Sequence, residues 1–156
     1  FDAVGGLIGQ HRQKQAIGEA MRIVAEVNKY VSDMAPWKLK GDDERDRLGT
    51  ILHVTAQAVA DCNLILAPFL PHSANVVDRV LGGAGEVAPM PVIEEVIDLD
   101  DPSLGYPIIT GEYSSAPRWE RRPITPGTPI EKPAPVFTKL DVSVVDEELR
   151  RLEQGA

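Results

Sequence analysis

The sequence has little that would support a disulfide, a metal centre or a membrane anchor. Its 156 residues include a single cysteine, Cys62, so the chain can form neither an internal disulfide nor a thiolate metal cluster. Three widely spaced histidines argue against a zinc site: His11, His53 and His72. No apolar run approaches the roughly 18–20 residues that span a bilayer, and the first ten residues lack the features of a secretory leader. We therefore expect a cytoplasmic protein without a metal or a membrane partner.

The chain also lacks an excess of basic residues and any recognisable catalytic motif. It has 16 Lys and Arg against 24 Asp and Glu, a net charge of −8, which argues against coating DNA or RNA through bulk charge. Any contact with nucleic acid must therefore be local. The glycine clusters at 5–9 and 82–85 follow no predicted strand, so they do not indicate phosphate-binding loops. The sequence predicts no catalytic residue and no cofactor in this chain.

The composition changes near Leu81 and divides the chain into two parts. Residues 1–81 carry 9 basic and 10 acidic side chains with 3 prolines, whereas residues 82–156 carry 7 basic and 14 acidic side chains with 10 prolines. We expect a helical bundle in the first part. In the second we expect an acidic, proline-rich tail that wraps back over the bundle, because so many prolines favour a chain that runs over a surface.

Apolar spacing predicts an all-α, antiparallel bundle. A first piece at 3–10 and a break around 11–13 precede a helix whose apolar residues, from Ile17 to Met34, recur three and four apart and predict a buried stripe. Pro36 should end this helix. The next helix should open at the acidic cluster 42–44, and its wide stripe, from Leu48 to Leu66, predicts neighbours on two sides. A short helix at 73–81 should end at Gly82.

The tail offers weaker signals. Residues 92–97 and 107–110 are candidate extended pieces, and a final helix is expected at about 144–152. Ser143, three residues before Asp146, would cap this helix.

The corner between the two long helices carries the most distinctive local sequence. Pro36 fixes the backbone just before Trp37, and Lys38 and Lys40 follow at alternate positions. An aromatic ring held in this way can stack on an unpaired base, and lysines beside it can contact phosphates. The alternative is that Trp37 closes the end of the bundle with its indole N–H bonded to a backbone carbonyl. From composition alone this structural role is favoured, and Arg12 and Lys14, at the other helix break, would be solvated charges.

Three motifs in order resemble the C-terminal, anticodon-binding region of methionyl-tRNA synthetases, in a bacterial, actinobacterial style. The first is Asn28-Lys29-Tyr30-Val31 followed by Ala35-Pro36-Trp37-Lys38. The second is the end of the long helix, Leu66-Ala67-Pro68-Phe69-Leu70-Pro71-His72-Ser73-Ala74. The third is the run 126–141, in which Lys132-Pro133 precedes Val136-Phe137. Together the motifs cover nearly the whole chain.

The resemblance implies a role for Trp37, because in this family the tryptophan after the proline stacks on the first anticodon base, a cytosine. Lys38, Lys40, Arg12 and Lys14 then become candidates for phosphate or loop contacts, while Asn28, Tyr30 and Pro36 are expected to be structural. The family's other anticodon readers, an Asn and an Arg, lie on an upstream helix outside this chain. The bundle is thus expected to lack its first helix.

The resemblance also implies that this chain is a part of an aminoacyl-tRNA ligase without an active site. The family's His-Ile-Gly-His and Lys-Met-Ser-Lys-Ser signatures are absent from the sequence. ATP and methionine, with magnesium, are expected only in the catalytic domain outside this chain. That domain and the anticodon loop of methionine tRNA are the expected partners. The acidic tail should lie on the side away from the anticodon stem.

Two alternatives stay open. One is a helical protein-interaction module whose tail docks on a partner, which exposed apolar side chains around Ile108, Ile109, Val136 and Phe137 and a buried Trp37 would favour. The other is the related helical domain of another class I synthetase, such as the isoleucine or cysteine enzyme, against which the motif at Lys132-Pro133 argues.

Overall fold

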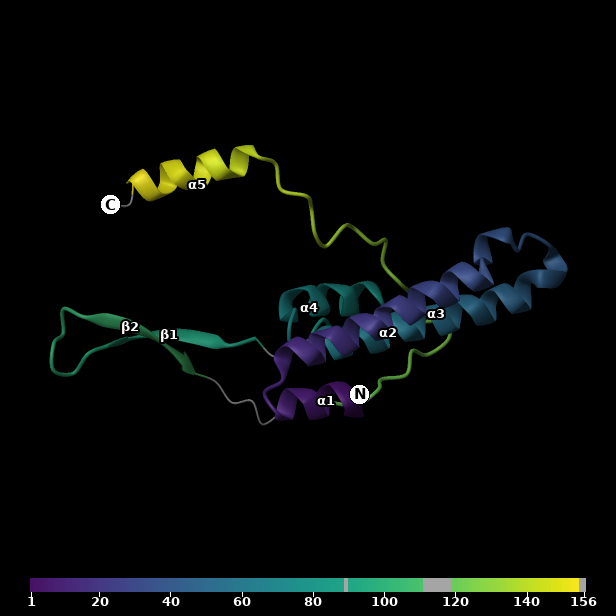
Figure 1. Cartoon of the computed structure of the whole chain (residues 1–156), viewed down its shortest axis with the longest axis horizontal. Helices are drawn as coiled ribbons and strands as arrows, with labels where there is room; N and C mark the ends of the chain where they lie inside the picture. Colours follow the sequence, from purple (N-terminus) through teal and green to yellow (C-terminus); the bar gives the residue numbers. More distant parts are fainter. Residues whose placement is uncertain (89, 111–118, 155–156) are drawn as a thin grey trace.

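Two long helices frame the molecule. In the computed structural model, which describes residues 1–88, 90–110 and 119–154, helix α2 (Gln13–Met34) lies antiparallel to α3 (Arg45–Leu66) (Figure 1). Two short 3₁₀ turns connect them, η1 (Pro36–Lys38) and η2 (Asp42–Glu44). The predicted helix end at Pro36 and the start at the acidic cluster are both found. The connection lies at the tip of a long helical hairpin.

Two shorter helices pack near the other end of this hairpin. Helix α1 (Asp2–Gly9) contacts α2, and α4 (Pro71–Val80) contacts α3. The break after α1 is made by His11 with a positive φ of 58°, and α4 ends before Gly82, whose φ is +88°. The core between the helices is small and consists mainly of alanine and aliphatic side chains: Val4, Ala16, Ala20, Ile51, Leu64, Ile65, Ala67 and Ala74.

The predicted apolar stripes are only partly buried, which corrects the sequence interpretation. On α2, Ala16 and Ala20 are buried, whereas Ile17 and Met21 are exposed. On α3, Leu52 and Val59 are exposed as well. The reason is that the neighbouring helices cover only part of each apolar face. Periodicity had identified the apolar face but not its coverage.

A β-hairpin interrupts the otherwise helical chain. Strands β1 (Val92–Ile97) and β2 (Gly105–Thr110) pair antiparallel, with Val92 opposite Thr110 and Ile97 opposite Gly105. They occupy the extended pieces expected from the sequence. The hairpin projects from the bundle at the end opposite to the turns between α2 and α3 (Figure 1).

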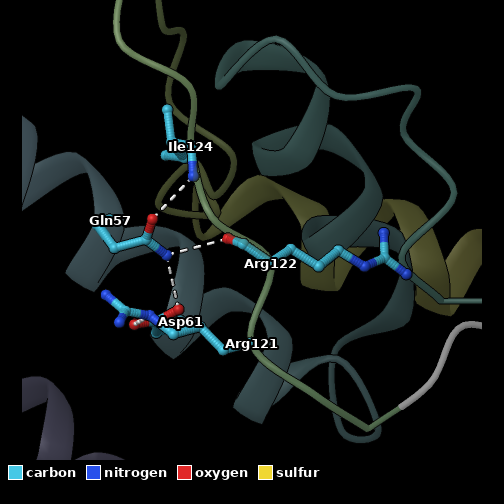
Figure 2. A network of polar contacts seen from close by, with 5 residues as sticks. All are labelled: Gln57, Asp61, Arg121, Arg122 and Ile124. Atoms are coloured by element: carbon cyan, nitrogen blue, oxygen red, sulfur yellow. Dashed lines mark hydrogen bonds and ion pairs between the residues drawn. The ribbon is translucent and has the colours of Figure 1, made fainter.

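Residues 119–131, which we call the strap, run along the bundle. Hydrogen bonds between side chains of the bundle and backbone groups of the strap hold it there. Gln57 of α3 is buried, with 6% of its surface exposed, and its amide spans two residues of the strap. Gln57 Nε2 donates to the Arg122 carbonyl oxygen at 3.0 Å, and the Ile124 N–H donates to Gln57 Oε1 at 2.8 Å (Figure 2). Asp61 completes the network, accepting from Gln57 Nε2 at 2.8 Å and pairing with Arg121 at 3.0 Å. The strap therefore has a fixed register on α3.

The last helix, α5 (Ser143–Gln154), extends away from the bundle (Figure 1), and none of its residues is buried. It matches the helix expected at about 144–152. The cap differs from the prediction: Ser143 is already the first residue of the helix, and the Asp141 carboxylate accepts its N–H at 2.9 Å. The backbone hydrogen bond from Ser143 lowers the pKa of Asp141. The division of the chain into a bundle at 1–81 and a tail at 82–156 stays a prediction.

We predict that the strap depends on Gln57. Gln57→Ala leaves the Arg122 carbonyl and the Ile124 N–H without their partner, so the free energy of unfolding should fall by about 2 kcal/mol. Urea denaturation measures this change, with Gln15→Ala on the exposed face of α2 as the matched control. Equal midpoints for the two variants would contradict the assignment.

Candidate nucleic-acid interface

The backbone around Pro36 holds Trp37 at the tip of the helical hairpin. Ala35 adopts a left-handed conformation, φ 42° and ψ 58°, where α2 ends, and Pro36 opens the following turn. Two hydrogen bonds close that turn: Lys38 N–H donates to the Ala35 carbonyl at 2.9 Å, and Leu39 N–H to the Pro36 carbonyl at 3.2 Å. A left-handed alanine costs roughly 1–2 kcal/mol. The corner is thus a defined conformation maintained by its surroundings.

The Trp37 side chain is open to solvent. It is 60% exposed, and its indole N–H donates no hydrogen bond to any residue in the described part of the chain. A tryptophan that closed the end of the bundle would be largely buried with its N–H satisfied. This geometry does not match a structural plug and leaves ring surface available for stacking.

Trp119, rather than Trp37, is the tryptophan that packs against other parts of the chain. The sequence analysis did not predict this role. Its indole N–H donates to the Phe1 carbonyl at 3.2 Å, and its ring meets the Phe1 ring edge to face with centroids 5.5 Å apart. The ring also lies over Gly5, where an added Cβ would come within 2.7 Å of the indole nitrogen. Trp119 therefore joins the start of the strap to α1.

Charges of both signs follow Trp37 closely in the sequence. Lys38 and Lys40 are exposed on the same turn, and Arg45 and Arg47 follow at the start of α3. Four carboxylates lie in the same stretch: Asp42, Asp43, Glu44 and Asp46. The formal charge of residues 36–47 is therefore zero, so bulk electrostatic attraction would contribute little to RNA binding here.

Arg12 and Lys14 lie at the opposite end of α2. Both are exposed, and Arg12 donates to the Gln10 side chain at 3.4 Å. A rise of 1.5 Å per residue gives the 22 residues of α2 a length of roughly 33 Å. The structure thus brings Lys38 and Lys40 together with Trp37 and separates Arg12 and Lys14 from it.

The three remaining motif residues differ in their surroundings. Pro36 and Tyr30 are half-buried, as structural residues would be, and Pro36 occupies the first position of η1. Asn28 has an exposed side chain, and its carbonyl oxygen accepts the Ser32 hydroxyl at 3.0 Å.

Other candidate chemistry is sparse. Cys62 is buried, and desolvation, together with the charge of Asp61, raises the pKa of its thiol, which disfavours the reactive thiolate. No cluster of three metal-ligating side chains occurs within residues 1–88, 90–110 and 119–154. Over the same residues, the helices are too short or too polar to cross a bilayer.

Comparison with known proteins finds similar sequences among methionine–tRNA ligases. The chain is 73% identical over 153 residues to a methionine–tRNA ligase of Nocardioides sp., a match that covers 98% of the chain and 25% of that ligase. It is 60% identical to the corresponding ligase of Salinispora arenicola, over 97% of the chain and 25% of the ligase. The ligase of Beutenbergia cavernae is 58% identical, over the whole chain and 26% of its own length. No family model and no solved structure matches.

Over nearly its whole length, the chain is similar to one segment of actinobacterial methionine–tRNA ligases. This confirms the resemblance found in the three motifs and disfavours the isoleucine and cysteine enzymes. The chain spans about a quarter of the length of the ligases it matches. Its mostly helical fold fits a helical domain of such a ligase.

The two tryptophans give a prediction for stability. Trp37→Ala should change the free energy of unfolding by no more than about 0.5 kcal/mol, because the ring is mostly exposed. Trp119→Ala should lower it by about 1–2 kcal/mol, because it removes the hydrogen bond and ring contact to Phe1. Urea denaturation of both variants tests this contrast. A larger loss in Trp37→Ala than in Trp119→Ala would restore the plug interpretation.

Proposed function

We propose that this chain is the tRNA-binding segment of a methionine–tRNA ligase, the enzyme that joins methionine to its tRNA with ATP. The segment binds the anticodon loop and contains no active site. One observation carries the proposal: Trp37 is 60% exposed on a turn whose backbone is fixed. The names of the similar ligases support methionine tRNA as the substrate.

The chemistry of an anticodon loop fits this corner. Its bases are unpaired and can be splayed out, so proteins read them by stacking and by hydrogen bonds to base edges. Stacking on an aromatic side chain contributes roughly 1–3 kcal/mol per base and needs no basic groove. A corner without net charge can therefore bind one loop while leaving other RNA unbound.

The proposal also assigns a role to each part of the chain and names the binding partners. Residues 1–81 bind the anticodon loop in the cytoplasm, and within the tail at 82–156 the strap returns over the bundle. The catalytic part of the ligase is the second partner, and ATP, methionine and magnesium bind there. The acidic hairpin projects from the end of the bundle opposite to the connection between α2 and α3 (Figure 1), and that connection carries Trp37; this supports a tail kept apart from the anticodon stem.

A protein-interaction module is the alternative function. Its support is the exposure of apolar side chains in the tail, with Ile109 and Phe137 about 70% exposed. The exposure of Trp37 counts against it, because a buried ring would have favoured that alternative.

The central test is Trp37→Ala in the full-length ligase. We expect kcat/KM for methionine tRNA to fall about 5- to 150-fold, the range that corresponds to the loss of one stacked base. Methionine activation, measured by ATP–pyrophosphate exchange, should stay unchanged because it uses the catalytic part alone. Trp37→Phe is the matched control and should lose less, since a smaller ring still stacks. An equal loss in charging and activation would disprove the role in RNA binding.

The lysines provide a second test with built-in controls. Lys38→Ala and Lys40→Ala should each weaken tRNA binding and reduce the dependence of log Kd on log salt by about 0.7. Arg12→Ala and Lys14→Ala remove the same charge at the other end of α2 and should leave that dependence unchanged. Filter binding between about 50 and 200 mM salt gives the slopes. If all four variants behaved alike, the contact would be diffuse rather than local.

A further inference from the structure

A carboxylate holds the chain that leads from Trp37 into α3. Glu44 Oε2 accepts the backbone N–H groups of Lys40 and Gly41, both at 3.1 Å. The N–H of Glu44 donates to the Gly41 carbonyl, also at 3.1 Å. The residue directly before α3 thus binds back to the residues that follow the turn of Trp37. The segment Lys40–Glu44 becomes a closed loop.

This loop matters because the position of Trp37 depends on its backbone. With most of its ring in solvent, Trp37 has little side-chain packing to fix it. On one side its turn is held by Ala35 and Pro36 at the end of α2. On the other side the half-buried Glu44 ties it to the start of α3. A platform ordered before RNA arrives binds more tightly, because less conformational freedom is lost on binding.

We propose that Glu44 is a positioning residue that holds the Trp37 corner in its RNA-binding conformation. The proposal rests on the proposed function of Trp37. Glu44 acts through the backbone and makes no contact with RNA. Its charge would by itself repel a phosphate backbone. When this side chain is removed, positioning therefore predicts weaker tRNA binding, whereas simple electrostatics predicts tighter binding.

The first experiment compares three variants of the full-length ligase. Glu44→Ala should raise KM for methionine tRNA about fivefold, the effect of losing a helix-terminal acceptor, with kcat and ATP–pyrophosphate exchange unchanged. Glu44→Gln should keep KM within about twofold, because its amide oxygen still accepts both N–H groups. Asp43→Asn is the matched control. It removes one negative charge from the neighbouring residue, whose side chain makes no hydrogen bond to a described residue, and should not raise KM.

An unchanged or lower KM in Glu44→Ala would overturn the proposal, as would equal effects of Glu44→Ala and Glu44→Gln. The double variant Trp37→Ala/Glu44→Ala adds a second criterion. If Glu44 acts through Trp37, its removal changes KM by less than about twofold when Trp37 is already absent. The full fivefold effect in that background would mean that Glu44 acts independently of the ring.

A measurement without RNA separates this proposal from the proposed function. Trp37 fluorescence anisotropy, recorded in a Trp119→Phe background, reports how firmly the ring is held. Glu44→Ala should lower the anisotropy and raise acrylamide quenching, whereas Glu44→Gln should not. If Trp37→Ala leaves tRNA binding intact while this anisotropy change is present, the RNA-binding role fails and the positioning role stands. If the anisotropy is unchanged, the positioning role fails on its own.

Discussion

The chain reversal between α2 and α3 is the constraint on which the rest of the structure depends. Two antiparallel helices of 22 residues each are joined by only ten residues, 35–44. Ala35 turns the backbone into the left-handed region, and Pro36 prevents α2 from continuing. Because both helices are long, this reversal lies at the end of the hairpin opposite to α1 and α4 (Figure 1). Trp37, which lies in this reversal, is 60% exposed.

The small core raises the question of how a proline-rich chain stays bound to the bundle. Prolines lack the N–H groups needed to pair in a sheet, so the strap cannot be held as a strand. Side-chain amides replace that pairing. Gln57 binds the backbone of Arg122 and Ile124, and Asn75 binds the N–H and carbonyl of Ala88, both at 2.9 Å. Such hydrogen bonds determine which residues of the chain lie against which residues of the bundle. Contact between aliphatic side chains alone would not determine this.

Signals that act over a few residues predicted the helices well. Pro36, the acidic cluster at 42–44 and Gly82 each mark a boundary through the backbone of their neighbours. The strap was beyond such reasoning, because Gln57 finds its partners 65 and 67 residues away. Likewise, nothing in the local sequence separates an exposed Trp37 from a Trp119 that packs on Phe1. The exposure of Ile17 and Met21 shows a related limit, since periodicity identifies an apolar face and not what covers it.

In the proposed RNA contact, affinity and selectivity come from different residues. Every base has a π face, so stacking on Trp37 stabilises binding without choosing among bases. Selection requires donors and acceptors aimed at a base edge. From the resemblance of the motifs we expect those readers, an Asn and an Arg, on a helix outside this chain. Residues 36–47 carry no net charge, so tight binding to arbitrary RNA is also disfavoured. A neutral and rigid stacking surface therefore suits a segment whose selectivity comes from elsewhere, because it adds affinity only once a base has been placed over it.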